Sequence, residues 1–181
     1  HYPLRRQRQM CIRDSSMGYW SQASRTHVAH MRGGDFFSHE TSTTIEKACK
    51  VRIELEDSNG NVTVMKPELP LLDGEVIDAM YMSKKALCDF FDEQLDDAKN
   101  TGILFSLHVK ATMMKVSHPI VFGYAVRRFY KELFDQHGDT LEQIGANPNN
   151  GLSHIYQKIE ELPISQRLEI ESTIRACYLH R

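Results

Sequence analysis

Apolar and charged residues alternate over residues 51–56, with valine, isoleucine and leucine on one side of the chain. This period of two predicts a strand with one buried face. The sequence Asp57-Ser-Asn-Gly60 follows, and the alternation resumes at Val62. Because Asn-Gly supplies the positive φ angles of a tight turn, the stretch predicts a β-hairpin.

Later stretches carry apolar residues every three or four positions, which predicts helices. The predicted ranges are 83–99, 119–138, a short helix from 139, then about 152–161 and about 165–178. Ser83 is a suitable cap for the first helix, and Ser117 followed by Pro119 is suited to the start of the second. Gly138 is expected to end that second helix.

Between the first two helices, residues 103–110 alternate once more. Four apolar residues from Ile103 to Val109 would project to one side, with Ser106, His108 and Lys110 on the other. Residues 16–48 are expected to be loop with short pieces of structure, and residues 67–82, with their two prolines, are expected to be an irregular connection. The order of elements predicts an α/β fold, in which a mixed sheet (the hairpin plus a buried strand) is covered by several helices.

Composition indicates a soluble globular protein. Hydrophobic residues make up 41% of the 181 residues, and 22 basic against 24 acidic side chains give a net charge of −2. This balance argues against nucleic-acid binding, and no apolar stretch approaches the roughly 20 residues of a membrane helix. Four widely spaced cysteines without a Cys-x-x-Cys pair favour reduced thiols and a cytoplasmic location.

The first fifteen residues differ from the rest. The run RRQRQMCIR at residues 5–13 has four arginines and no apolar core, so it is not a secretory signal. A basic localisation or nucleic-acid patch is one reading. We favour the other, that residues 1–15 are a non-native or disordered segment and that residues 16–181 form the domain.

Lys110 is the candidate catalytic residue, because it lies where the third predicted strand ends. Ligands of open α/β sheets bind beyond the carboxyl ends of strands. An ammonium group held among apolar side chains loses its proton more readily, which suits proton transfer. The alternative at this stage is a surface lysine whose stem packs and whose ammonium reaches water.

Other candidates are less specific. His27 and His30 could lie on one face of a helix near Asp35 and bind a metal, although no third ligand is evident and a polar network of loop histidines explains them equally. Gly33-Gly34-Asp35 could contact a ligand or form a turn. The chain has no G-x-G-x-x-G and no P-loop, so no residue is assigned to a cofactor or a metal.

Several stretches together resemble the monomeric NADP-dependent isocitrate dehydrogenase family. The chief stretches are Met17–Met31, Gly74–Asp78, Met82–Leu87, Leu107–Ser117 (LHVKATMMKVS), Asn149–Gly151 and Ile155-Tyr156. They run in order from residue 16 to the end of the chain. The resemblance implies that residues 16–181 are part of the catalytic domain of a longer enzyme with an isocitrate/isopropylmalate dehydrogenase-like fold.

The resemblance also implies a chemistry. Members of this family oxidise isocitrate with NADP and release carbon dioxide, using Mg²⁺ or Mn²⁺ to stabilise the resulting enolate. The family's catalytic lysine maps onto Lys110, and Lys115 is a weaker candidate for a supporting role. The metal, NADP and other substrate-binding residues would lie outside this segment, so the isolated segment is expected to be inactive. The parent is expected to be a cytoplasmic monomer of the tricarboxylic acid cycle and glyoxylate bypass.

Three positions depart from the family pattern, in which Asp is common: Arg32, His118 and His154. Two other functions stay open. A lysine at a strand end also suits Schiff-base chemistry in a lyase, and the segment could instead be a non-catalytic α/β interaction module.

Overall fold

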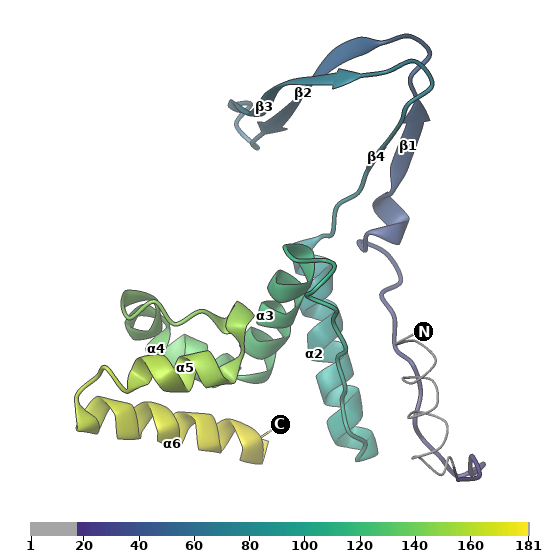
Figure 1. The fold of residues 1–181 in the computed structure, drawn as a ribbon. Coiled ribbons are helices and arrows are strands. Elements are labelled where there is room, and N and C mark those ends of the chain that lie inside the picture. The colour runs from purple at the N-terminus through teal and green to yellow at the C-terminus, as the bar shows by residue number, and fades with distance from the viewer. Residues whose placement is uncertain (1–17, 181) are drawn as a thin grey trace, which may run out of the picture.

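In the computed structural model, which describes residues 18–180, a β-arm projects from a body of packed helices (Figure 1). The elements of the arm are η1 (Phe37–His39), β1 (Thr41–Thr44), β2 (Cys49–Glu56), β3 (Val62–Leu71) and β4 (Val76–Ala79). The elements of the body are α2 (Lys84–Thr101), α3 (Ser117–Phe129), α4 (Lys131–Gln143), η2 (Pro148–Asn150), α5 (Leu152–Ile159) and α6 (Ile164–His180). The predicted N-terminal segment 1–15 lies outside the described residues.

The arm consists of two separate antiparallel pairs, β2 with β3 and β1 with β4. The predicted hairpin is confirmed: Gly60 has φ +81°, its N–H donates to the Asp57 carbonyl, and Asp57 accepts further bonds from the Asn59 and Asn61 amides. The hydrogen bond from the Asn61 side chain is the main cause of a lowered pKa of the Asp57 carboxyl, and the bonds from the Asn61 and Asn59 amides lower this pKa further. The turn that the sequence predicts therefore connects β2 to β3 at the tip of the hairpin.

The irregular connection predicted over residues 67–82 is wrong. β3 continues through Pro67 and Pro70 to Leu71, and β4 follows at Val76. Proline lacks the N–H of a central strand, but in a two-stranded sheet each strand is an edge strand and tolerates it. The half-buried face expected for β2 is also missing, since Ile53 and Leu55 are exposed. No other layer packs on this sheet within the described residues.

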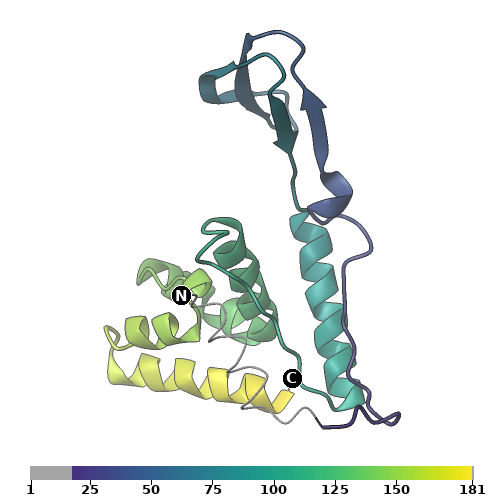
Figure 2. The ribbon, with the colours of Figure 1, turned by 45° about the vertical axis from the view of Figure 1, so that its right-hand side comes forward.

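The strand predicted over residues 103–110 does not form a sheet. Residues 104–109 make no backbone hydrogen bond with another described residue, and the segment runs beside α2 (Figure 2). The predicted alternation is nonetheless present, with Ile103, Phe105, Leu107 and Val109 half-buried and the residues between them exposed. The fold is α/β in content, but the predicted mixed sheet with helices covering it is wrong for residues 18–180.

The first helix forms as the sequence predicts. The Ser83 Oγ accepts the Ala86 N–H at 3.3 Å, and Gly102 ends α2 with φ +64°. Leu87, Phe91 and Leu95 of α2 are buried. A bidentate pair between Arg128 of α3 and Asp92 of α2 joins these two helices. The hydrogen bonds to the Asp92 carboxylate raise the pKa of the Arg128 guanidinium.

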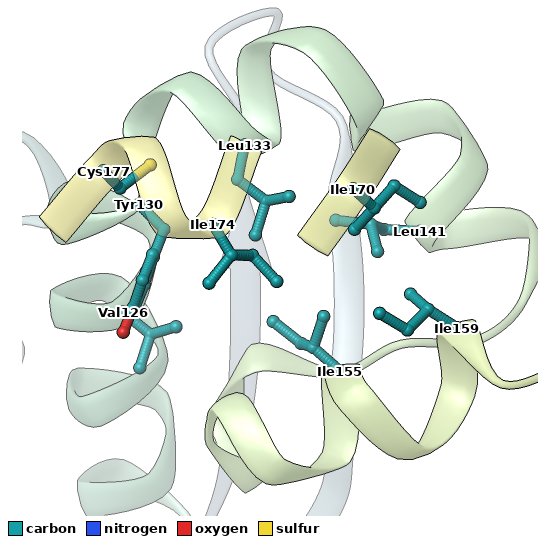
Figure 3. Close-up of a cluster of buried hydrophobic side chains, with 9 residues drawn as sticks. All are labelled: Val126, Tyr130, Leu133, Leu141, Ile155, Ile159, Ile170, Ile174 and Cys177. Carbon is teal, nitrogen blue, oxygen red and sulfur yellow. The ribbon is translucent and has the colours of Figure 1, made fainter. Parts of the chain in front are cut away.

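One apolar cluster forms the core of the body (Figure 3). Its members come from the end of α3 and from α4, α5 and α6, and they are Val126, Tyr130, Leu133, Leu141, Ile155, Ile159, Ile170, Ile174 and Cys177. Leu133, Ile155, Ile159 and Ile174 are completely buried. At about 25 cal/mol per Å² of apolar area removed from water, this cluster is the main stabilising feature of the body.

The second and third helices divide at Tyr130, not at Gly138 as predicted. α3 ends at Phe129, and α4 runs from Lys131 through Gly138 to Gln143. Tyr130 is buried, packs edge-on against Tyr178 of α6, and donates its hydroxyl to the Tyr178 hydroxyl at 2.5 Å. The break therefore follows from packing against α6, which local sequence signals do not report.

Two helical glycines provide a test of this packing. A Cβ at Gly123 of α3 would lie 1.8 Å from Asn149 Oδ1 and 3.1 Å from Asn149 Cα, so Gly123 lets η2 approach the helix closely. A Cβ at Gly138 of α4 would meet nothing within 4 Å.

We expect Gly123→Ala to lower the free energy of unfolding, because overpacking costs about 1–3 kcal/mol and exceeds the gain of up to about 1 kcal/mol in helix propensity. Gly138→Ala, the matched control, has only the propensity gain and should stabilise the chain. Urea unfolding followed by circular dichroism measures both. Equal stabilisation by the two substitutions would contradict the close approach at Gly123.

Candidate functional site

Lys110 lies at the end of a row of polar side chains on the exposed side of residues 103–110. Ser106, His108 and Lys110 alternate with the half-buried apolar residues, as the sequence predicts. The Ser106 Oγ and the His108 Nε2 are 2.7 Å apart and share a hydrogen bond. The apolar side is fixed to the body, because the Phe105 ring meets the Phe91 ring edge-on with centroids 6.4 Å apart.

The chain turns back immediately after Lys110, and hydrogen bonds close the turn. The Lys110 N–H donates to the His118 Nδ1 at 2.8 Å. The His118 N–H donates to the Met114 carbonyl at 3.2 Å, and the Met114 N–H donates to the Lys110 carbonyl at 3.2 Å. Met113 gives the Lys110 carbonyl a second N–H at 3.1 Å. Both backbone groups of Lys110 are therefore held by the turn, which leads directly into α3.

The start of α3 differs from the prediction in detail. The helix begins at Ser117, with Val116 as the N-cap residue and no side-chain cap. The predicted Ser117 cap is therefore wrong, while Pro119 does lie in the first turn, where its missing N–H has no cost. The sequence shows His118 only as a departure from the family pattern, and no local signal in it predicts the bond to Lys110.

The apolar surroundings expected for the Lys110 ammonium do not bury it among the described residues. Lys110 is exposed, and it does not line the cavities formed by residues 27–33 with α2, by α4 with residues 145–148, or by residues 105–107 with α2, α3 and α6. Apolar side chains of the turn that follows it are exposed too, Met113 by 64% and Val116 by 75%. Lys115, the weaker candidate, is also exposed. The turn after Lys110 therefore presents apolar side chains at the surface without covering the lysine.

A cavity of 860 Å³ lies elsewhere, between residues 27–33 and α2. His27 and His30 both line it. The His27 Nε2 lies 3.1 Å from Asp97, and its Nδ1 lies 2.9 Å from the Arg25 carbonyl. No group of three His, Cys, Asp or Glu side chains able to hold a metal occurs within residues 18–180. His27 thus links an extended segment to α2.

Of the two glycines before Asp35, Gly34 has a packing role. It has φ +76°, its carbonyl accepts the Ser83 N–H at 2.7 Å, and a Cβ there would lie 2.7 Å from the Ala86 Cβ. A Cβ at Gly33 would meet nothing within 4 Å, and Gly33 lines the cavity beside α2. Hydrogen bonds from Ser38 lower the pKa of the Asp35 carboxyl. The turn predicted for these residues thus joins the chain to the start of α2 through Gly34.

A smaller apolar cavity of 300 Å³ lies where residues 105–107 meet α2, α3 and α6. Tyr130 and Tyr178 line it. Burial, with the hydrogen bond to Tyr178, raises the pKa of the Tyr130 hydroxyl. A phenol held in its neutral form beside an apolar cavity serves structure, so we assign it no catalytic part.

None of the helices in residues 18–180 has both the length and the apolar character needed to span a membrane.

Known proteins similar to this chain share one description. The family model of monomeric isocitrate dehydrogenase matches residues 10–181. Isocitrate dehydrogenase [NADP] 2 of Mycobacterium tuberculosis is 61% identical over 166 residues, which are 92% of this chain and 22% of that protein. The protein of the same name from Psychrobacter sp. is 56% identical with the same coverage. Isocitrate dehydrogenase [NADP] of Azotobacter vinelandii is 46% identical over 91% of the chain and 22% of its own length.

These matches extend across the candidate site and the helical body. The chain spans 22% of the length of each of these relatives. The family match starts at residue 10, within the N-terminal segment 1–15. The boundary at residue 15 stays a prediction.

Proposed function

This chain belongs to the monomeric isocitrate dehydrogenase family, and on that premise we propose that residues 16–181 are an internal part of the catalytic domain of an NADP-dependent isocitrate dehydrogenase. The observation that carries the proposal is the high identity over 92% of the chain to a relative of that name. The reaction is the oxidation of the isocitrate hydroxyl by NADP followed by loss of carbon dioxide, giving 2-oxoglutarate. The remainder of the parent chain is the segment's necessary partner.

Within that reaction, we assign Lys110 the exchange of a proton with the substrate hydroxyl and later with the enol oxygen. Its positive charge would also help to hold the substrate carboxylates. The support is positional: both backbone groups of Lys110 are held by the turn, and the exposed apolar side chains of Met113 and Val116 belong to that same turn. Covering this surface with other parts of the parent would supply the sheltered environment that proton transfer requires.

The metal and NADP belong, in this proposal, to other parts of the parent. The described residues offer no set of three metal-binding side chains, so they do not fit the Mg²⁺ or Mn²⁺ of the reaction, and we derive no step through the ion. The four cysteines are widely spaced in the sequence, without a Cys-x-x-Cys pair. Such spacing favours reduced thiols and agrees with the cytoplasmic location that we propose, together with a monomeric parent acting in the tricarboxylic acid cycle and the glyoxylate bypass.

The alternative functions have less support. A Schiff-base lyase would use the same amine of Lys110, but the similar proteins carry the isocitrate dehydrogenase name and not that of a lyase. A non-catalytic interaction module would account for the exposed apolar surface. It would not account for matches that carry the dehydrogenase name across nearly the whole chain.

We also propose that residues 104–109 pair with a strand of the remaining parent chain. Their backbone groups have no partner among the described residues, and their side chains already alternate between a packed and an exposed side. Unpaired backbone groups on an extended edge readily bind another strand. The pairing would turn the isolated segment into the buried strand that the alternation predicts.

The assignment of Lys110 can be tested in a chimera in which residues 16–181 replace the matching part of the Mycobacterium tuberculosis relative. We expect isocitrate-dependent formation of NADPH by this chimera and none by the 181-residue chain alone. Lys110→Met should lower kcat by about 10²–10⁴-fold, the usual contribution of a general acid–base group. The Kd for NADPH, measured by fluorescence titration, should stay unchanged.

Lys115→Met is the matched control, because it removes an exposed lysine from the same turn. It should retain most of the turnover. If the Lys110→Met chimera kept its full kcat, Lys110 would have no part in the mechanism.

The strand pairing predicts a difference in hydrogen exchange. In the 181-residue chain, the amides of residues 104–109 should exchange quickly because they lack partners. In the chimera they should exchange at least about 100-fold more slowly, since ladder hydrogen bonds protect amides. The amide of Leu133 in the core serves as the reference and should be protected in both proteins. Equally fast exchange of residues 104–109 in the two proteins would exclude the pairing.

A further inference from the structure

Three hydrogen bonds form a closed ring through Lys110, Met114 and His118. Lys110 donates to the His118 side chain, His118 donates through its backbone to Met114, and Met114 donates back to Lys110. Two of the three links join backbone groups only. The third depends on one imidazole nitrogen, so His118 is the only side chain in the ring.

The direction of that bond determines the state of the imidazole. A backbone N–H can only donate, so the His118 Nδ1 must act as the acceptor and carry no proton. The ring proton of neutral His118 therefore lies on Nε2. At 2.8 Å the bond has the length of a well-formed N–H hydrogen bond. His118 is half-buried in the first turn of α3, a helix that is packed onto the core through Val126.

We infer that His118 is a positioning residue for Lys110, an inference that rests on the proposed function of the lysine. Residues 104–109 reach Lys110 without backbone hydrogen bonds to other described residues. The His118 Nδ1 therefore joins the end of this segment to α3 and fixes the backbone from which the Lys110 side chain leaves. Without that bond, the amine would move relative to a substrate held by other parts of the protein.

The chain contains a second bond of the same kind, remote from Lys110 in the sequence. The His154 Nδ1, in the first turn of α5, accepts the Asn147 N–H at 3.1 Å. It closes a turn by the same chemistry without contacting the Lys110 turn. His154 is therefore a matched control for the loss of an imidazole-to-amide bond.

The position of the acceptor atom can be tested by substitution. Asparagine places its Oδ1 where histidine places Nδ1, directly on Cγ, whereas leucine of similar size offers no acceptor. We expect His118→Leu in the chimera to lower kcat by about 10- to 100-fold, the effect of a displacement near 1 Å. The Kd for NADPH should not change. His118→Asn should restore most of the lost kcat, and His154→Leu should leave kcat close to that of the parent chimera.

A purely structural role of His118 makes a different prediction. Asn and Leu at position 118 would then lower thermal stability to different extents but leave kcat of the folded enzyme alike, and equal kcat values in the two variants would overturn the inference. Nitrogen-15 NMR of the 181-residue chain gives an independent readout, because His118 should show a protonated Nε2 and an unprotonated Nδ1. A proton on Nδ1 would also overturn it.

Failure of this inference is distinguishable from failure of the proposed function. If Lys110→Met retained turnover, the role of the lysine would be rejected, whatever the His118 variants did. If Lys110→Met abolished turnover while His118→Leu kept full kcat, the lysine would remain catalytic and only its positioning by His118 would be rejected.

Discussion

Exclusion of water from the cluster between α3 and α6 is the interaction on which the rest of the described structure depends. Leu133, Ile155 and Ile174 are fully buried in it, and residues from α3, α4, α5 and α6 all contribute to this apolar interior. α2 attaches to the other helices of the body through its own apolar face and the Arg128–Asp92 pair. The β-arm, by contrast, contributes a single buried side chain, Leu71. Two-stranded sheets are marginally stable alone because neither face is covered.

The same dependence explains how Lys110 is presented. The segment that carries it has no sheet partner, so its position comes from apolar contact with α2 on one side and from the turn into α3 on the other. Both supports lead back to the helical body. The amine is thus held at a defined place while the exposed apolar residues around it leave room for another part of the parent. In the proposed function, one segment supplies an oriented lysine and the remaining chain supplies cofactor, metal and shelter.

Two of the positions that depart from the family pattern have a common physical explanation. His118 and His154 each use Nδ1 to accept a backbone N–H near the start of a helix. A carboxylate or amide oxygen one bond from Cγ would occupy the same position, so the imidazole can replace such a group without altering the turn. For Arg32, which is exposed, the structure offers no comparable explanation.

Features with a local cause were predictable from the sequence: the hairpin turn at Asp57–Gly60, the Ser83 cap, the last two helices and the two-sided character of residues 103–110. Each depends on side chains or backbone preferences within a few residues. The helix break at Tyr130, the strands that run through prolines, the absence of a common sheet and the His118 bond to Lys110 were decided by tertiary structure. They depend on which distant groups become neighbours and on which faces receive a covering layer, and no local pattern of residues contains that information.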